Sequence, residues 1–375
     1  MNILICPDSF KGTLTSIQVC NLIESAIKEK SPDCNITKLP VADGGEGLCE
    51  ALYSSVGGEK IQVKTKNPFN ADMIAEYVAL NNETAVIEMA ACAGLPLAGN
   101  RANPLYTTTY GVGLMIKDAY ERGFKNILLG LGGSATNDCG IGMANALGFD
   151  FLDAKGNGID PIGKNLINIE KILLPKERLK INITAACDVK NPLYGENGAA
   201  YVFAPQKGAS KDDVILLDKG LEHIAKIIKR DLNIEISDIS EAGAAGGLGA
   251  GTIAFLNGKL KSGIDIVLDT IGFDEKLKNC DAVITGEGKF DSQSAQGKVI
   301  SGVCNKARLY NKPVFALCGC MEENADYKSI GIEYLLTSSE TTKTIEEIRN
   351  TVKNDVKNSA SKLFTEILDF FKKKT

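Results

Sequence analysis

Both ends of the chain alternate short aliphatic runs with amphipathic helical patterns, and this alternation constrains the fold more than any other feature. Residues 2–6 and 36–41 are predicted strands. A helical pattern lies between them, and Thr15-x-x-Gln18 at its start matches a capping box. The last hundred residues repeat the rhythm, with predicted strands at 282–285, 314–317 and 334–337 and helices near 298–310 and 344–372. Such alternation predicts a parallel sheet covered by helices on both faces.

The middle of the chain has a different pattern. Runs at 61–64, 74–80 and 85–89 are separated by Asn/Pro and Asn/Asn turns, which predicts an antiparallel meander. A helix at 110–122, strands at 126–129 and 183–187 and a hairpin at 149–158 are expected to follow. The length of 375 residues also fits two domains. We therefore expect an α/β protein in which a mixed domain, residues 67–279, is inserted into a doubly wound domain made from residues 1–66 and 280–375.

Composition excludes several classes of partner. The chain has 42 Lys and Arg against 47 Asp and Glu, a net charge of −5, and its last basic run, Lys372 to Lys374, is short. No nucleic-acid partner is therefore expected. The long uncharged stretch at 242–258 is interrupted by glycines, so no membrane partner is expected either. The N-terminus is predicted to be a strand and not a leader, and the eleven cysteines contain no C-x-x-C pair. We expect reduced thiols and a cytoplasmic location.

A single histidine limits the chemistry. His223 lies one step off the apolar stripe of a helical pattern at 211–230, which predicts a position at the surface or at the core boundary. One histidine cannot make a His-ligated zinc site, and it disfavours Ser-His-Asp or Cys-His catalysis. Carboxylates and lysines are left as the acid–base groups of an enzyme.

Five turns that follow predicted strands carry Asp or Glu, and four of them also contain glycine. In open α/β sheets, ligands collect at the carboxyl ends of the strands. Glycines there let backbone amides approach phosphate oxygens, and helix N-termini favour anions. Carboxylates among such amides would repel a bare phosphate, but they fit if Mg²⁺ lies between. The turns are Pro7 to Gly12, Ala42 to Gly47, Gly130 to Asp138, Ala186 to Asp188, and Gly286 to Ser294.

Other interpretations remain open for these turns. A single glycine-rich turn is more often only a tight turn. The run 243–251 fits either a nucleotide loop or a small-residue helix packed against the sheet. Gly130-x-Gly132-x-x-Ala135, with Asp150 twenty residues beyond, matches the dinucleotide fingerprint, so an NAD(P)-dependent oxidoreductase is an alternative. A non-catalytic nucleotide-binding protein is another. Against the oxidoreductase, Asp138 would lie at the pyrophosphate site, and the other carboxylates would have no use.

Taken together and in chain order, the motifs resemble the type I glycerate kinase family. The segments are Asp8-Ser9-Phe10-Lys11-Gly12, Ala42-Asp43-Gly44-Gly45-Glu46-Gly47, Thr107-Thr108-Thr109-Tyr110-Gly111, Gly132-Gly133-Ser134-Ala135-Thr136-Asn137-Asp138, Cys187-Asp188-Val189, Pro205-Gln206-Lys207-Gly208-Ala209, the run 243–251 and Thr285-Gly286-Glu287-Gly288. Cys139 stands where the family pattern has Gly. The resemblance implies ATP-dependent phosphorylation of D-glycerate with Mg²⁺, in a cleft between a flavodoxin-like domain and the inserted domain. Either the 2- or the 3-hydroxyl could be the acceptor, and bacterial members often make the 2-phosphate.

The resemblance and the chemistry of phosphoryl transfer together suggest roles for individual residues. Asp188 is expected to orient the glycerate hydroxyl and accept its proton, and Lys11 to neutralise charge on the phosphoryl group or the substrate. The carboxylates expected on the metal are Asp43, Glu287 and Asp291, with Glu46 and Asp8 as alternates. The residues expected to bind phosphate or substrate are Ser9, Gly44, Gly45, Gly132, Gly133, Ser134, Asn137 and Asp138. Arg101 and Lys207 are candidates either for the glycerate carboxylate or for a solvated surface.

Overall fold

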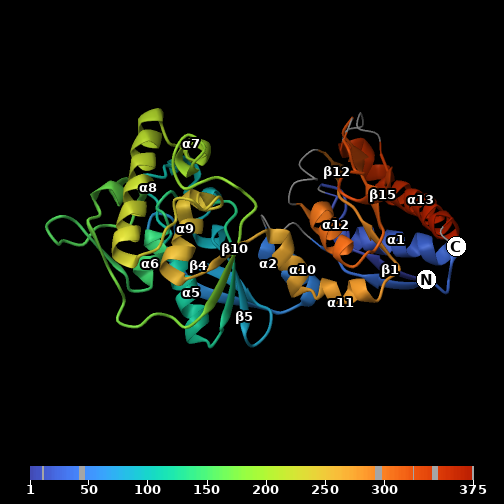
Figure 1. Cartoon of the computed structure of the whole chain (residues 1–375), viewed down its shortest axis with the longest axis horizontal. Coiled ribbons are helices and arrows are strands. Elements are labelled where there is room, and N and C mark those ends of the chain that lie inside the picture. The colour runs from blue at the N-terminus through green and yellow to red at the C-terminus, as the bar shows by residue number, and fades with distance from the viewer. Residues whose placement is uncertain (11, 42–46, 292–297, 324, 340–344, 374–375) are drawn as a thin grey trace. The chain divides into compact units, whose positions relative to one another are not determined.

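The computed structural model describes residues 1–10, 12–41, 47–291, 298–323, 325–339 and 345–373. The chain divides into two compact units (Figure 1). Unit 1 combines Met1–Gly44, Ser54–Val56 and Ile264–Thr375, and unit 2 combines Gly45–Tyr53 and Gly57–Gly263.

These boundaries differ from the expected 67 and 279 for two packing reasons. Strand β3 (Glu59–Lys66) pairs along its whole length with β4 (Asp72–Ala79), so it belongs to unit 2. Helix α10 (Gly263–Thr270) packs against α12 (Val299–Leu309) of unit 1, where a Cβ on Gly302 would lie 2.5 Å from the Ile264 side chain.

Unit 1 is built on a five-stranded, all-parallel sheet in the order β15-β13-β11-β1-β2. Counted along the chain, that order is 2-1-3-4-5, the flavodoxin-like arrangement, and the expected doubly wound fold is confirmed. The register aligns Ile3 with both Ala282 and Ile36. The strands are β1 (Asn2–Ile5), β2 (Asn35–Lys38), β11 (Ala282–Thr285), β13 (Val314–Cys318) and β15 (Ile332–Thr337), beside a small pair, β12 (Lys289–Phe290) and β14 (Cys320–Met321).

Helices cover both faces of this sheet. Helix α1 (Ser16–Lys30) and α13 (Ile345–Lys372) share one apolar cluster with alternate residues of β1, β11 and β13, whereas α12 packs on β11 and β13 from the other face. The predicted capping box is present, since Thr15 accepts from the amide of Gln18 and the Gln18 side chain accepts from the amide of Thr15. Helix α11 (Phe273–Lys278) leads into β11.

Unit 2 contains a mixed six-stranded sheet in the order β10-β9-β6-β5-β4-β3. The antiparallel meander predicted for the middle of the chain is present as β3, β4 and β5. The other neighbours in the sheet are parallel, so the carboxyl ends of β5, β6, β9 and β10 share one edge. Besides β3 and β4, the strands are β5 (Thr84–Glu88), β6 (Asn126–Gly130), β9 (Asn182–Ala186) and β10 (Lys259–Lys261).

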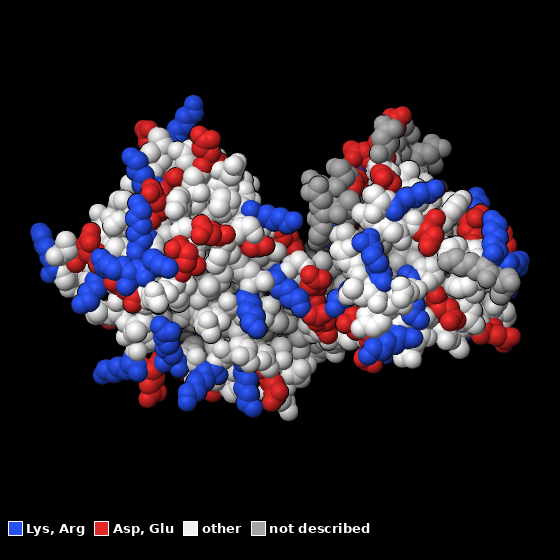
Figure 2. All heavy atoms as spheres, in the orientation of Figure 1, with Lys and Arg blue, Asp and Glu red and all other residues white. Residues whose placement is uncertain are grey.

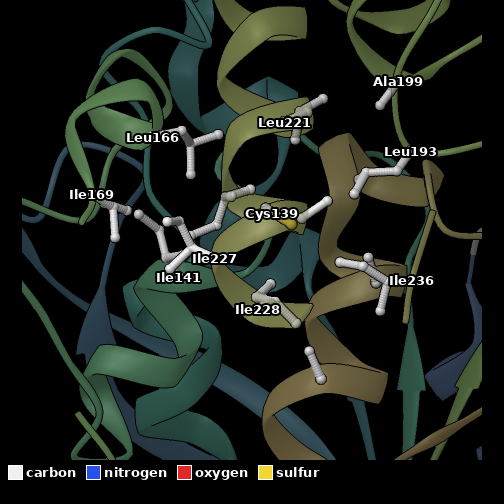
Figure 3. Packing of buried hydrophobic residues seen from close by; sticks show 14 of the residues in the cluster. Cys139, Ile141, Leu166, Ile169, Leu193, Ala199, Leu221, Ile227, Ile228 and Ile236 are labelled. Carbon is white, nitrogen blue, oxygen red and sulfur yellow. The ribbon is translucent and has the colours of Figure 1, made fainter. Parts of the chain in front are cut away.

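Two clusters of buried apolar side chains pack helices of unit 2 above one face of this sheet. The first joins the strands to α5 (Tyr110–Glu121), α6 (Ile141–Ala146) and α9 (Ala244–Leu256). The second lies between α6, α9 and α8 (Lys211–Leu232), where Ile141, Leu221 and Ile228 converge (Figure 3). The remaining elements are α2 (Leu48–Val56), α3 (Ala90–Ala93), α4 (Leu95–Ala98), α7 (Ala199–Phe203), the 3-10 turns Gly99–Arg101, Gly163–Asn168 and Pro205–Lys207, β7 (Asp150–Leu152) and β8 (Lys171–Leu173).

Two local predictions have different outcomes. The hairpin expected at 149–158 is reduced to one isolated bridge between Leu152 and Gly158, because β7 pairs instead with β8. His223 is half-buried at the core boundary, where its Nε2 lies 2.8 Å from the carbonyl oxygen of Ile169, as the helical periodicity predicts.

The described part of the chain has no helix that is both long enough and apolar enough to span a bilayer. On the face shown in Figure 2, acidic and basic side chains are interspersed over each unit.

Candidate functional site

Unit 1 has a pocket of about 400 Å³ at the carboxyl ends of its strands. Asp8 and Ser9 follow β1, Glu287 and Asp291 follow β11, and Ser338 follows β15. The neighbouring strands β1 and β11 mark the point where the strand order reverses, and open α/β sheets bind ligands at such a point. The structure thus brings together three residues expected at the site, namely Ser9, Glu287 and Asp291, and the alternate Asp8.

The backbone after β11 is packed too tightly against its neighbours for any side chain at residue 286. The amide of Asp8 donates to the carbonyl oxygen of Gly286 at 2.8 Å. A Cβ on Gly286 would lie 1.9 Å from the carbonyl oxygen of Leu317, so only glycine fits. The turns after β1 and β11 are therefore held side by side, which fixes Asp8 and Glu287 on the same wall of the pocket.

The carboxylates of this pocket fit a hard cation. Glu287 and Asp291 supply oxygen ligands of the kind that Mg²⁺ prefers. One of these carboxylates also has a basic side chain nearby, since Lys298 Nζ lies 3.9 Å from Asp291 Oδ1. Within the described ranges, no three His, Cys, Asp or Glu side chains gather as a metal-binding group. The predicted residues Lys11, Asp43, Gly44 and Gly45, and the alternate Glu46, lie outside those ranges.

Unit 2 has a pocket of about 340 Å³ at the carboxyl edge of its sheet. Gly132, Gly133 and Ser134 line it from the turn after β6, and Asp188 lines it from the turn after β9. The other walls come from Leu95, Leu131, Ala186, Cys187, Val189, Phe203, Gln206, Lys207, Ala244 and Ala245. Four residues that the sequence places at the site thus share one cavity.

Asp138 anchors the glycine turn from behind. Its carboxylate is fully buried and accepts four hydrogen bonds, from the amide and the hydroxyl of Thr109 at 2.7 and 2.8 Å and from the amides of Gly140 and Gly142 at 3.2 and 3.3 Å. Burial raises the pKa of Asp138, and these donors oppose the rise. Asp138 does not line the pocket, so the structure gives it a supporting position and not the expected ligand contact.

The neighbouring Asn137 is also fully buried and away from the pocket lining. Neither the oxygen nor the nitrogen of its side-chain amide has a hydrogen-bond partner among the described residues, and the same is true of Thr136 Oγ1. Buried polar atoms are usually paired, and each unpaired one costs about 1–3 kcal/mol. The turn therefore has polar side-chain atoms, on Thr136 and Asn137, that no described residue pairs with.

Of the two expected interpretations of the run 243–251, the structure shows the small-residue helix packed against the sheet. Most of it is the first part of α9, packed in the core, but Ala245, Gly246 and Gly247 have left-handed backbone angles. This left-handed turn docks on the glycine turn, where the amide of Cys139 donates to the carbonyl oxygen of Gly246 at 3.0 Å. Cys139 itself has a φ of 52°, which explains why the family pattern has Gly there. Ala244 and Ala245 reach the pocket.

Asp188 is held by the start of α10. Its Oδ1 accepts the amide of Gly263 at 2.8 Å. The carboxylate therefore has a fixed orientation while it lines the pocket, which suits a group that must meet one hydroxyl of a bound substrate.

Lys207 is buried, although the sequence allowed a solvated position. Its side chain is 2% exposed, and Nζ donates to Ser134 Oγ at 2.6 Å and to the carbonyl oxygen of Thr136 at 2.8 Å. Burial lowers its pKa to about 7, against a smaller opposing effect of Asp138. The other cation considered, Arg101, is exposed and stacks over the Phe69 ring at 4.5 Å, away from the pocket.

The family model for glycerate kinases matches residues 3–368. The chain belongs to the glycerate kinase family. A glycerate kinase from Haemophilus influenzae is 44% identical over 332 residues, which cover 87% of this chain and 88% of that protein. A glycerate 2-kinase from Escherichia coli is 44% identical over 329 residues, 86% of each protein. A crystal structure of a protein assigned as glycerate kinase 2 in Salmonella typhimurium LT2 has a TM-score of 0.87 and 38% identity, and the match covers 99% of both chains.

Membership of the glycerate kinase family confirms the resemblance seen in the motifs, and the structure removes the support for the oxidoreductase. A dinucleotide fingerprint opens directly into a helix, whose N-terminus binds the pyrophosphate. Here the helix after β6 begins only at Ile141, well beyond Gly130-x-Gly132-x-x-Ala135. The intervening turn is folded around the buried Asp138, which is incompatible with a pyrophosphate at that position.

A larger pocket, of about 600 Å³, lies at the amino ends of β9 and β10 and contains no predicted site residue. Parallel sheets bind their ligands at the carboxyl ends of the strands, so this pocket is not a candidate site.

Three residues in or near the candidate site were not predicted from the sequence. Lys298 and Ser339 line the unit 1 pocket. Glu88, at the end of β5, accepts the amides of Gly47 and Leu48 through Oε1 at 2.8 and 3.0 Å. Its carboxylate therefore occupies the N-terminus of α2. An acid that ends an apolar strand run was the available signal for Glu88.

Proposed function

We propose that this protein is a glycerate kinase that transfers the γ-phosphoryl group of ATP to a hydroxyl of D-glycerate with the help of Mg²⁺. The observation that carries the proposal is the unit 2 pocket. It combines a fixed carboxylate, Asp188, with a glycine turn and a buried amine, Lys207. A small hydroxy acid needs these three kinds of partner, for its hydroxyl proton, its oxygens and its negative charge.

On the acceptor side, Asp188 would orient the hydroxyl and take its proton as the oxygen attacks phosphorus. The turn at Gly132, Gly133 and Ser134 would hold oxygens of glycerate or of the transferring group. Phosphoryl transfer asks for this positioning and for charge stabilisation, and it needs little covalent chemistry from the protein.

On the nucleotide side, Asp43, Glu287 and Asp291 would hold the metal ion, with Asp8 and Glu46 as alternates. Mg²⁺ supplies neutralisation of the phosphate charge at such a site. Ser9 and the glycines Gly44 and Gly45 would bind phosphate oxygens. Lys11 would stabilise the negative charge that develops on the transferring group.

Coupled ADP-release assays with ATP, Mg²⁺ and D-glycerate test the activity directly. We expect turnover that needs all three components, and no ADP release with glycerol in place of D-glycerate. A parallel absorbance scan for NAD(P)H should stay flat. Binding of ATP without D-glycerate-dependent ADP release would instead identify a nucleotide-binding protein and refute the proposal.

The position of the new phosphate is a separate question with its own readout. We propose the 2-hydroxyl as acceptor, since the E. coli relative is named as a glycerate 2-kinase. Phosphorus NMR of the product should then match authentic 2-phosphoglycerate, and a match to the 3-phosphate would contradict the assignment.

A further inference from the structure

We propose that Lys207 binds the carboxylate of the acceptor substrate and thereby makes the unit 2 pocket selective for hydroxy acids over neutral polyols. This inference rests on the proposed function, because it assigns a residue to one end of the proposed substrate. Lys207 lines the same pocket as Asp188, so one three-carbon ligand could meet the amine with its carboxylate and Asp188 with its hydroxyl.

The partners of Lys207 leave its charge uncompensated. Nζ donates to Ser134 Oγ and to the carbonyl oxygen of Thr136, both of which are neutral. An ammonium group has three N–H donors. No third acceptor and no ion pair for Nζ is found in the described part of the chain. One N–H of the protonated amine, and the positive charge of that form, thus remain for a ligand in the pocket.

The charged groups around Lys207 do not serve as its counter-ion. Asp138 attracts the amine electrostatically but is not among its hydrogen-bond partners, and its oxygens accept from Thr109, Gly140 and Gly142. Asp188, the other acid on the pocket wall, is tied to Gly263. A buried cation with only neutral contacts is unfavourable, and an anionic ligand removes that penalty.

The fold holds Lys207 in this position through Gly208. Gly208 has a φ of 93°, and a Cβ there would lie 2.0 Å from the carbonyl oxygen of Ala102. The turn at Pro205–Lys207 is therefore pressed against residue 102, and this contact directs the lysine inward. A lysine with a purely structural role would be unfavourable here, because burying its amine without a counter-ion costs free energy of folding. An apolar side chain could fill the same space without that cost.

The test compares Lys207→Met with a matched control, Lys211→Met, an exposed lysine at the start of α8. Charge-assisted hydrogen bonds are worth a factor of roughly 10–100 in affinity. We therefore expect Lys207→Met to raise the KM and the Kd for D-glycerate about 10- to 100-fold, to leave the KM for ATP near that of the wild type, and to unfold no earlier on heating. The control should match the wild type in all of these.

Two results would overturn the assignment. The first is an unchanged KM for D-glycerate in Lys207→Met. The second is a folded Lys207→Met protein in which the KM for ATP rises as much as the KM for D-glycerate, which would show that the lysine only braces Ser134 and Thr136. Since the wild-type enzyme is assayed alongside, an absence of D-glycerate kinase activity in the wild type would refute the proposed function instead.

Calorimetry of the wild type keeps the proposal testable even if the variant does not fold. At pH 8, D-glycerate binding should take up protons from buffer, because the carboxylate favours the protonated amine of Lys207. Titrations in two buffers of different ionisation enthalpy measure that uptake. Zero uptake would contradict the assignment, and in a folded Lys207→Met the uptake should disappear.

Discussion

Replacing Gly246 by alanine should destabilise unit 2 far more than the same change at a glycine with a similar φ and open surroundings. Gly246 has a φ of 69°, where an L side chain costs about 1–2 kcal/mol. The new Cβ would also lie 2.1 Å from the carbonyl oxygen of Thr136 and 2.5 Å from Asn137 Cα. Forcing backbone apart adds about 1–3 kcal/mol. We expect a total loss of about 2–5 kcal/mol for Gly246→Ala.

Gly156→Ala is the matched control. Gly156 has a φ of 81°, and a Cβ added there would have no other atom within 4 Å, so only the backbone cost of about 1–2 kcal/mol applies. Because the chain has no Trp, far-UV circular dichroism during urea unfolding is the suitable readout. The displaced Thr136 carbonyl is a partner of Lys207, so Gly246→Ala should also raise the KM for D-glycerate. A Gly246→Ala protein as stable as Gly156→Ala would refute the packing argument.

Three further predictions follow from the hydrogen bonds and pKa shifts of unit 2. Asp138→Ala leaves four donors without an acceptor and should lower the free energy of unfolding, measured in urea, by about 3–5 kcal/mol. Asp138→Asn keeps an oxygen where three of these donors converge, so it should lower the same free energy by only about 1–2 kcal/mol. Asp188→Asn should unfold like the wild type, because an amide oxygen can still accept from α10, yet it should lose nearly all D-glycerate-dependent ADP release; ordinary turnover would move the base elsewhere. The pKa of Lys207 is about 7 in the folded chain, against the ordinary lysine value of 10.5 in the unfolded chain. Between these two values the unfolded state binds more protons, so Lys207 makes the free energy of unfolding rise with pH. Lys207→Met should flatten that rise between pH 7 and 10 in urea titrations.

Local signals made most of the fold predictable. The strand at 282–285 and the capping box at Thr15 depend on residues adjacent in sequence, and both are present in the structure. The unit boundaries were not predictable in this way. They depend on β3 pairing with β4 and on α10 packing against Gly302, contacts between residues far apart that periodicity does not encode.

The position of the candidate site at the carboxyl ends of the strands was predictable for the same reason as the fold, because turns after parallel strands must share an edge. The roles of individual residues within it were less accessible. Lys207 and Asp138 both looked like polar turn residues, but one is a buried amine on the pocket wall and the other a buried anchor behind it. That difference is set by Gly208 and Thr109, whose contacts arise only in the folded chain. The roles of Asp188, Lys11 and the metal carboxylates stay predictions.

The pairing of β1 with β11 has a consequence for how the protein is made. Ile3 lies beside Ala282, so one edge of a strand whose Ile3, Leu4 and Ile5 are buried stays uncovered until the ribosome has added nearly 280 further residues. All strands of the unit 2 sheet are translated before that point. During synthesis the inserted unit can therefore complete its sheet first, while the N-terminal strand waits for its partner and is exposed to aggregation and to chaperones.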